Sequence, residues 1–390
     1  MRSSALRGIA IAGITSIVLA GCGGGDSAGS DDGDLVVGVL WAQTGPASGT
    51  GKRVLQAAEL AAEEINADGG IDGRDLTVKA FDAKANPETA TQEAQRAASE
   101  GVVAIVGPQS SSEALAVGEV AERSKLPTIV NAAAANAVTE DRKFVFRVQA
   151  PARDLAAGFV DTAVDTLKGK KLLSIHDETA FGVDLDQNVK QYAKSAGVTI
   201  DDTVAFEAAS TDLTPQVNRI AAINPDVVIL SNALGADSGL LARQMVEAGI
   251  QSSLIGTTTI GFADSLEVAR GAIDKLPGGV YSVLSVDPSK AEYDDFKSKY
   301  EKKFGAVEGT FEDPVVQSYD SVYLLAEALK ASDGKGGQDL ATALEGLEPR
   351  AGVTGREGSE QHFGKDHEAY ETGKFVSPFK WEDGAFVLAK

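Results

Sequence analysis

The chain has 390 residues, and its 57 Asp and Glu outnumber its 36 Lys and Arg, which gives a formal net charge of −21. This acidic balance excludes the basic footprint that a nucleic-acid partner requires and indicates a soluble surface. A single cysteine allows no intramolecular disulfide, so hydrophobic packing must hold the fold together, and the length favours two domains over one.

The first 21 residues predict an export signal. Arg2 and Arg7 precede an apolar run over 8–20, which is shorter than the roughly 20 residues of a membrane-spanning helix and ends in small residues. The letters LAGC that end at Cys22 resemble the lipobox of bacterial lipoproteins. This resemblance implies cleavage before Cys22 and lipidation of its sulfur, and two or more acyl chains anchor a protein stably. The alternative is an ordinary signal peptide followed by a chance cysteine.

Residues 22–34 predict a flexible tether. After Cys22 the run GGGDSAGSDDGD offers only one alanine to a hydrophobic core. Loss of the signal removes two Arg and no acid, so the formal charge moves from −21 to −23.

From residue 35 onward, apolar β-branched runs alternate with amphipathic, alanine-rich runs, which predicts alternating strands and helices. The predicted strands are 35–41, 76–82, 102–108 and 127–132, and the predicted helices are 54–67, 89–99 and 113–124. Near-continuous apolar strands indicate a parallel sheet with helices on both faces and right-handed crossovers.

The same alternation restarts after residues 149–151. It predicts helices at 155–168, 184–197, 213–223 and 239–249, and strands at 171–177, 226–232 and 252–258. Two successive sets predict an α/β fold with two doubly wound parallel-sheet lobes. The chain from 285 is more helical and ends in aromatic-rich short strands at 375–388.

Residues 45–53 imitate a phosphate-binding loop without matching one. Five residues separate Gly45 from the Gly51–Lys52 pair where the motif has four, and Arg53 stands where a magnesium-binding Ser or Thr is required. We therefore predict a turn that leads from the first strand into a helix.

The histidines give no catalytic or metal-binding pattern. His176, His362 and His367 lie in separate segments, the last two do not form an HExxH site, and no GxSxG motif is present. We predict solvated surface histidines, no catalytic residue, no metal and no cofactor.

The segment 107–112, GPQSSS, is the most informative candidate site. It follows a predicted strand and opens a helix, which is where ligands bind in open α/β sheets, and free N–H groups beside hydroxyls suit a carboxylate. The alternative is that the serines only cap the helix. A second loop, 131–136, follows the next strand and can bring main-chain N–H groups to the same point.

Several longer segments are similar to the periplasmic leucine/isoleucine/valine-binding protein family, the solute receptors of ABC importers. They include GVLWAQTGPASGTG, EEINADGGIDGRDLTVKAFDAKANPETA, VVAIVGPQSSSEA, LPTIVNAAAANAVTE and GLLARQMVEAGI. The resemblance spans residues 35–390 and implies two lobes joined by three hinge crossovers. It places residues 35–149 and about 285–374 in the N-terminal lobe, and 150–284 and about 375–390 in the C-terminal lobe.

The resemblance also implies ligand contacts. It assigns the ligand carboxylate to Ser111 and to main-chain groups near Ala132 and Ala134. A ligand-contacting Thr of the family aligns with Ala134, an aromatic stacking residue with Thr50, and a second-lobe Tyr with Phe181. Ser110 and Asn232, which ends the predicted strand 226–232, complete the candidate set.

The family's acid that receives an α-ammonium aligns with Thr258. An unpaired buried ammonium costs several kcal/mol, so either Asp237 replaces that acid or the ligand lacks the group. A shifted alignment in this glycine-rich region is the other explanation.

These expectations describe a monomeric solute-binding lipoprotein on the extracytoplasmic face of the cell membrane. The resemblance implies that it captures a small polar ligand with a carboxylate or amide, as in the branched-chain amino acid family, and delivers it to an ABC permease in the cytoplasmic membrane. It implies neither an enzyme nor a nucleic-acid partner. One alternative is a ligand-sensing receptor domain that signals to a membrane partner, and another is an enzyme that would consume its ligand.

Overall fold

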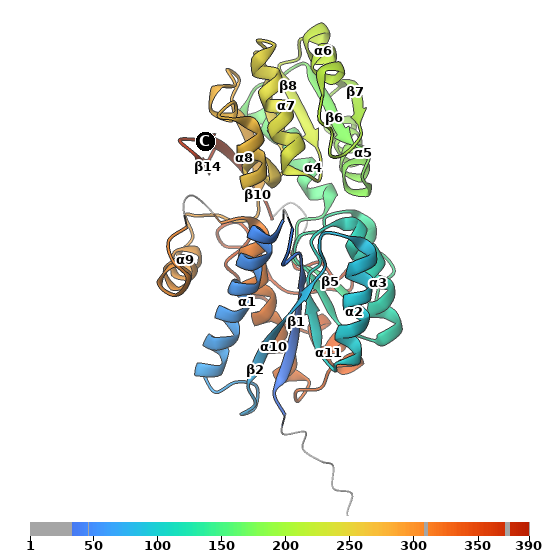
Figure 1. Cartoon of the computed structure of the whole chain (residues 1–390), viewed down its shortest axis with the longest axis vertical. Helices are drawn as coiled ribbons and strands as arrows, with labels where there is room; N and C mark the ends of the chain where they lie inside the picture. The colour runs from blue at the N-terminus through green and yellow to red at the C-terminus, as the bar shows by residue number, and fades with distance from the viewer. Residues whose placement is uncertain (1–32, 46, 308–310, 371–374, 390) are drawn as a thin grey trace, which may run out of the picture. The chain divides into compact units, whose positions relative to one another are not determined.

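The computed structural model describes residues 33–45, 47–307, 311–370 and 375–389. Within these residues the chain is α/β, with two large sheets that are each covered by helices (Figure 1). The predicted fold class is therefore confirmed. The predicted signal, Cys22 and most of the predicted tether lie outside the described residues.

The first sheet has five parallel strands in the order β2-β1-β3-β4-β5. They are β1 (Leu35–Trp41), β2 (Leu76–Asp82), β3 (Ala104–Val106), β4 (Thr128–Val130) and β5 (Val145–Arg147). Successive side chains of a strand point to opposite faces, and in β1 Val39 and Leu40 belong to different hydrophobic clusters. The sheet is consequently buried on both sides, as its apolar strands predict.

Six helices of the described chain accompany this sheet. They are α1 (Ser48–Ala67), α2 (Pro87–Ser99), α3 (Ser111–Ser124), α9 (Ala291–Phe304), α10 (Asp313–Ala331) and α11 (Gly337–Glu345). Helices α1 and α10 lie side by side although they are far apart in sequence, and they share a cluster with Val37 and Val39 (Figure 1). Ala94 of α2 and Val117 of α3 pack in the other cluster with Leu40.

The second sheet has the order β14-β13-β10-β9-β8-β6-β7. Its strands are β6 (Leu172–Asp177), β7 (Ile200–Phe206), β8 (Val227–Ser231), β9 (Ser253–Gly256), β10 (Val280–Leu284), β13 (Ser377–Glu382) and β14 (Ala385–Leu388). From β7 to β10 the strands are parallel and repeat the strand order of the first sheet. β13 and β14 add an antiparallel edge, so this sheet is mixed rather than purely parallel.

The helices that accompany the second sheet are α4 (Ala152–Asp161), α5 (Ala180–Ser195), α6 (Thr214–Ile223), α7 (Gly235–Glu247) and α8 (Ala263–Ala269), and a π-helical segment (Thr162–Thr166) continues α4. Val189 of α5 clusters with Ile229 of β8, whereas Leu241 of α7 clusters with Leu230 on the opposite face. Both faces are thus covered. Short pieces complete the described chain: η1 (Asn136–Val138), η3 (Thr258–Gly261), η4 (Ile273–Lys275), β11 (Arg350–Ala351) and β12 (Glu360–Gln361).

The chain passes between the two sheets three times: after β5, after β10 and before β13. A buried polar network ties the first two passages to α10. The Gln317 Nε2 group donates to Gln149 Oε1 at 2.6 Å and to Ser285 Oγ at 2.9 Å. Asp313 Oδ2 accepts from the N–H and the hydroxyl of Ser285 at 2.9 and 2.8 Å.

One prediction about side-chain environment is wrong. His367 was expected at the solvated surface, but it is only 4% exposed. Its ring stacks on Phe146 with 4.2 Å between centroids, and its Nδ1 lies 3.0 Å from the Val145 carbonyl oxygen. A histidine can be buried in this way because its flat ring packs like an apolar group while its nitrogens find polar partners.

Candidate functional site

The loops at the carboxyl ends of β1, β3 and β4 form the first half of the candidate site. In open parallel sheets ligands bind at these ends, beside the point where the strand order reverses, and here that point lies between β1 and β3. The loop after β1 leads into α1, as predicted, but α1 begins at Ser48, so residues 48–53 belong to the helix and not to the predicted turn. A Cβ at Gly51 would lie 1.9 Å from the Ala42 carbonyl oxygen, so glycine is what lets α1 pack this closely against the loop.

The serines that open α3 have different roles. Ser110 is the N-cap: its main-chain N–H donates to Glu113 Oε2 at 2.9 Å, and the Glu113 N–H donates back to Ser110 Oγ at 3.3 Å. This is a capping box, so the alternative that the serines cap the helix holds for Ser110. Burial raises the pKa of the Glu113 carboxyl.

Ser111, in contrast, reaches the neighbouring loop. Its side chain is buried, and its Oγ accepts a hydrogen bond from the Ala135 N–H at 3.2 Å. A hydroxyl that accepts from a main-chain N–H still has its own proton to donate. The structure therefore brings the segment 107–112 and the loop 131–136 together, and the Ser111 hydroxyl between them can still donate a hydrogen bond.

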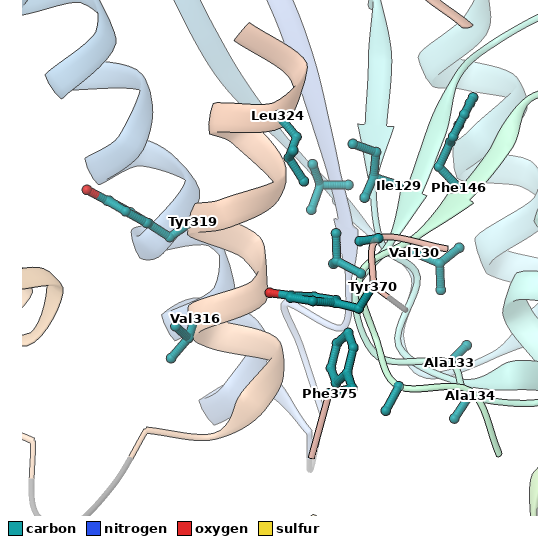
Figure 2. Close-up of a cluster of buried hydrophobic side chains, with 14 of the residues drawn as sticks. Ile129, Val130, Ala133, Ala134, Phe146, Val316, Tyr319, Leu324, Tyr370 and Phe375 are labelled. Carbon is teal, nitrogen blue, oxygen red and sulfur yellow. The ribbon is translucent and has the colours of Figure 1, made fainter. Parts of the chain in front are cut away.

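The loop 131–136, called the alanine loop below, is held by its carbonyl groups and by its last two N–H groups. The Ala134 carbonyl accepts from the Ala152 N–H at 2.7 Å. The N–H groups of Ala132, Ala133 and Ala134 have no hydrogen-bond acceptor among the residues that the structure describes. The methyl groups of Ala133 and Ala134 pack in the hydrophobic cluster around Val130 (Figure 2), so these residues can offer a ligand only main-chain groups.

Thr50 stands in the first turn of α1, next to a charged pair. Its hydroxyl lies 3.4 Å from Glu312 Oε1, and Arg53 Nε donates to the other carboxylate oxygen of Glu312 at 3.1 Å. Both side chains of the pair are partly exposed. Thr50 thus has a polar setting, unlike the aromatic residue that the family places there.

The predicted second-lobe residues follow β6, β8 and β9. Phe181 is in the first turn of α5 and Thr258 opens η3, and both are partly buried. Asn232 is fully buried, and its amide donates to the Leu234 carbonyl at 2.6 Å and bonds to the Ser238 hydroxyl at 2.9 Å. These bonds shape the loop after β8.

Asp237 does not have the surroundings expected of a replacement for the family's acid. It is 1% exposed, and its Oδ2 accepts from the Ala209 N–H at 3.0 Å. Burial, with added repulsion from Asp177 and Asp264, raises its pKa to about 6. Because Asp237 is almost fully buried and one of its oxygens already accepts from a main-chain N–H, it is poorly placed to reach a ligand ammonium.

Contacts between the alanine loop and α5 were missed by the sequence analysis. The Asn136 N–H donates to Asp184 Oδ2 at 2.7 Å, and its side-chain amide donates to Asn188 Oδ1 at 3.1 Å. No motif marks these polar residues, because their meeting depends on the tertiary fold.

Two cavities lie away from these loops. One of about 620 Å³ is lined by residues such as Val103 and Lys125, which precede β3 and β4, at the amino ends of the strands. Another of about 600 Å³ lies between α1 and α9. In the described ranges no helix has the length and apolarity to cross a membrane, and no cluster of three or more His, Cys, Asp or Glu could hold a metal ion.

The chain has curated relatives over most of its length. It is 26% identical to the Leu/Ile/Val-binding protein homolog 8 of Brucella abortus over 370 residues, covering 91% of this chain and 90% of the relative. It is 25% identical to homolog 3 of Brucella melitensis over 361 residues, covering 91% and 93%.

Solved structures share the fold. The leucine-binding protein LivK of Thermotoga maritima matches with a TM-score of 0.79 and 21% identity, covering 91% of this chain and 98% of that one. LivJ of Streptococcus pneumoniae, in complex with isoleucine, matches with a TM-score of 0.79 and 20% identity, covering 92% and 99%. An ABC transporter substrate-binding protein of Desulfitobacterium hafniense in complex with Leu matches with a TM-score of 0.75 and 23% identity. The match covers 91% of this chain and 99% of that one.

The family model described as periplasmic binding protein matches residues 34–382, nearly all of the chain that the structure describes. Together with the two α/β lobes, this match shows that the chain belongs to the periplasmic binding protein family.

Proposed function

We propose that this protein is an extracytoplasmic solute-binding lipoprotein. It captures a small polar molecule with a carboxylate or amide, related to the branched-chain amino acids, and delivers it to an ABC permease. The observation that carries the proposal is the Ser111 hydroxyl beside the unbonded N–H groups of Ala132–Ala134, at the switch point of the first sheet. The ligand classes of the relatives and the family match support the same function.

The start of α3 and the neighbouring alanine loop suit an anionic ligand. Ser111 is the first residue of α3, where free N–H groups and the helix dipole favour negative charge. Hydrogen bonds to a charged acceptor are roughly twice as strong as neutral ones. A carboxylate that accepts from Ser111 and the alanine loop would therefore be held without a cationic side chain.

The same geometry speaks against catalysis at Ser111. A serine nucleophile needs an adjacent base to take its proton. Among the described residues, the Ser111 hydroxyl is bonded by the Ala135 N–H, which is a donor and not a base. We propose that the ligand leaves the protein chemically unchanged.

Capture requires the second lobe to close over the ligand. We propose that Phe181, Asn232 and Thr258 form this side of the site, with Thr50 at its edge, and that the ligand stabilises the closed form by its higher affinity for it. The lobes are proposed to comprise 35–149 with about 285–374, and 150–284 with about 375–390. Lipidated Cys22 holds the monomer at the membrane.

Equilibrium dialysis tests the proposal. Wild-type protein is dialysed against amino acids, their 2-oxo acids, amides and aromatic acids, and each compound is quantified by chromatography on both sides of the membrane. We expect one compound to be retained at one molecule per chain and recovered unchanged. Conversion of the retained compound would instead identify an enzyme.

A further inference from the structure

Arg147, at the end of β5, is a fully buried cation whose partner comes from a remote part of the chain. Its Nε donates to Glu368 Oε2 at 2.8 Å, and its Nη2 forms a short contact with Glu368 Oε1. Thr139 also donates to Glu368 Oε1, at 2.8 Å. The carboxylate therefore holds the guanidinium by its two-pronged edge, the arrangement that fixes orientation best.

The main chain reinforces this pair. The Arg147 N–H donates to the His367 carbonyl at 2.8 Å, and the Ala369 N–H donates to the Arg147 carbonyl at 2.9 Å. Arg147 and Glu368 thus lie in a parallel β-bridge. Glu368 cannot drift away from Arg147 while this bridge persists.

The remaining edge of the guanidinium points to the alanine loop. Arg147 Nη1 donates to the Ala135 carbonyl at 2.7 Å. The Ala135 N–H, in turn, donates to Ser111 Oγ. Ser111, which we propose to bind the ligand, therefore holds the peptide group before Ala135, and Arg147 holds the peptide group after it.

We infer that Arg147, oriented by Glu368, is a positioning residue for the ligand site. It acts through the alanine loop by fixing the Ala135 carbonyl, at the end of the segment that carries the N–H donors of Ala132–Ala134, and it does not touch the ligand. This inference rests on the proposed function. Stability alone does not explain a buried ion pair, because apolar residues of similar size often stabilise a fold as well or better. Pre-organised donors, in contrast, bind a ligand without the cost of ordering the loop.

The test is amide hydrogen exchange of the full chain without ligand, read by mass spectrometry in the variant Arg147→Lys. A lysine ammonium can pair with Glu368 but lacks the fork that reaches Ala135 at the same time. We expect exchange of the Ala135 and Asn136 amides, which donate to Ser111 and Asp184, to rise at least tenfold, while exchange in β1 stays within twofold of the wild type.

Asp320→Asn is the matched control. Asp320 is also a buried carboxylate, but it accepts from the N–H groups of Val353 and Thr354, each at 2.9 Å, rather than from the alanine loop. Exchange in 131–136 should stay within twofold in this variant. An equal rise in Arg147→Lys and Asp320→Asn, or no rise in either, would overturn the inference.

Glu368→Gln provides a second variant if Arg147→Lys does not fold. It preserves the shape of the side chain but removes the charge that orients Arg147, so exchange in 131–136 should again rise more than in the control. The assay uses no ligand, so a flat result refutes the role of Arg147 even if wild-type protein binds a solute. Failure of every compound in dialysis would refute the proposed function and leave the exchange result standing.

Discussion

Two adjacent serines at the start of α3 have different roles, one in helix capping and the other in the proposed ligand site. Ser110 closes the helix by a capping box, whereas Ser111 turns its hydroxyl to the alanine loop. The proposed ligand contact belongs to Ser111 because its own proton is still available.

Ser111→Ala should therefore weaken ligand binding while the protein stays folded. Loss of a hydrogen bond to a charged group costs about 1.5–3 kcal/mol, or roughly ten- to hundredfold in affinity. Titration calorimetry with the ligand found by dialysis measures this change. Ser112→Ala is the control, since that exposed neighbour should change affinity less than about twofold. Equal affinities in wild type and Ser111→Ala would show that Ser111 has no ligand contact.

Asp313 is a second residue whose contribution to the free energy of unfolding depends on pH in a defined way. Its carboxylate is buried at the passage between the lobes, one oxygen accepts twice from Ser285, and the other has no partner in the described chain. Burial raises its pKa from 3.8 to about 6. Because the folded protein holds this proton more tightly, the stability that Asp313 contributes is full below about pH 3.8 and is lost as the pH rises through 6.

Asp313→Asn should accordingly stabilise the fold at pH 8 and give no gain at pH 3.5. The neutral amide oxygen can still accept from Ser285, and the shift of about two pKa units corresponds to a gain on the order of 2–3 kcal/mol. Urea unfolding at the two pH values measures the difference. A gain of the same size at both would mean that Asp313 does not titrate in this range.

At the scale of the helices, Glu64 of α1 joins α1 to α9 and α10. Its Oε2 accepts from the hydroxyls of Tyr319 and Tyr323 at 2.8 and 2.9 Å and pairs with Lys299 at 3.0 Å. Burial and the nearby carboxylate raise the pKa of both tyrosines, which keeps them protonated donors.

Glu64→Ala should destabilise the protein by about 2 kcal/mol, because two partly buried hydroxyls lose their acceptor. Glu63→Ala offers a control on the same helix. Glu63 is 63% exposed and forms a surface pair with Lys303, which is worth less than about 1 kcal/mol. The midpoint of urea unfolding should fall only for Glu64→Ala, and similar midpoints for both variants would contradict this role of Glu64.

Strand 35–41 has the predicted limits because uninterrupted apolar residues mark it. Strand 76–82 also has the predicted limits, although it is an edge strand in which Lys79 and Ala80 are exposed. β7 was not predicted: its letters IDDTVAF mix charged and apolar residues, since an edge strand is only partly buried. β5 and β10 were not predicted either, although β3 and β4 are as short as β5 and were predicted.

The candidate site was predictable only where local chemistry marks it. The run GPQSSS between a strand and a helix is a local signal, and the structure places it beside the alanine loop, as expected. The pairing of Arg147 with Glu368 spans 221 positions and depends on the second passage, which returns the chain to the first sheet after β10. Contacts of this range are set by tertiary packing, which no local pattern encodes.

At the scale of the whole molecule, the membrane attachment that we propose depends on Cys22, which lies outside the described residues. Cys22→Ala should remove the lipid, so the protein should either leave the membrane fraction without detergent or accumulate as an uncleaved precursor. Metabolic labelling with a fatty-acid analogue measures lipidation. Equal labelling of mutant and wild type would show that the lipid is not on Cys22.

The central claim is that the two lobes capture a small solute, and the nature of the site narrows its class. Thr258 can accept a hydrogen bond from an ammonium but cannot neutralise it, and Asp237 is almost fully buried and accepts from the Ala209 N–H. Leucine, isoleucine and valine should bind more weakly than their deaminated or uncharged-nitrogen counterparts, because an unpaired ammonium is penalised in a dry site.

Thermal unfolding of the wild-type protein with each compound tests this claim most directly. A ligand at 100 times its dissociation constant adds about 2.7 kcal/mol to the free energy of unfolding and raises the midpoint accordingly. We expect a 2-oxo acid, an amide, a urea-like compound or an aromatic acid to raise the midpoint by several degrees, and leucine to raise it less. A midpoint that no compound shifts would contradict solute capture, and a larger shift with leucine would contradict the ligand class derived from Thr258.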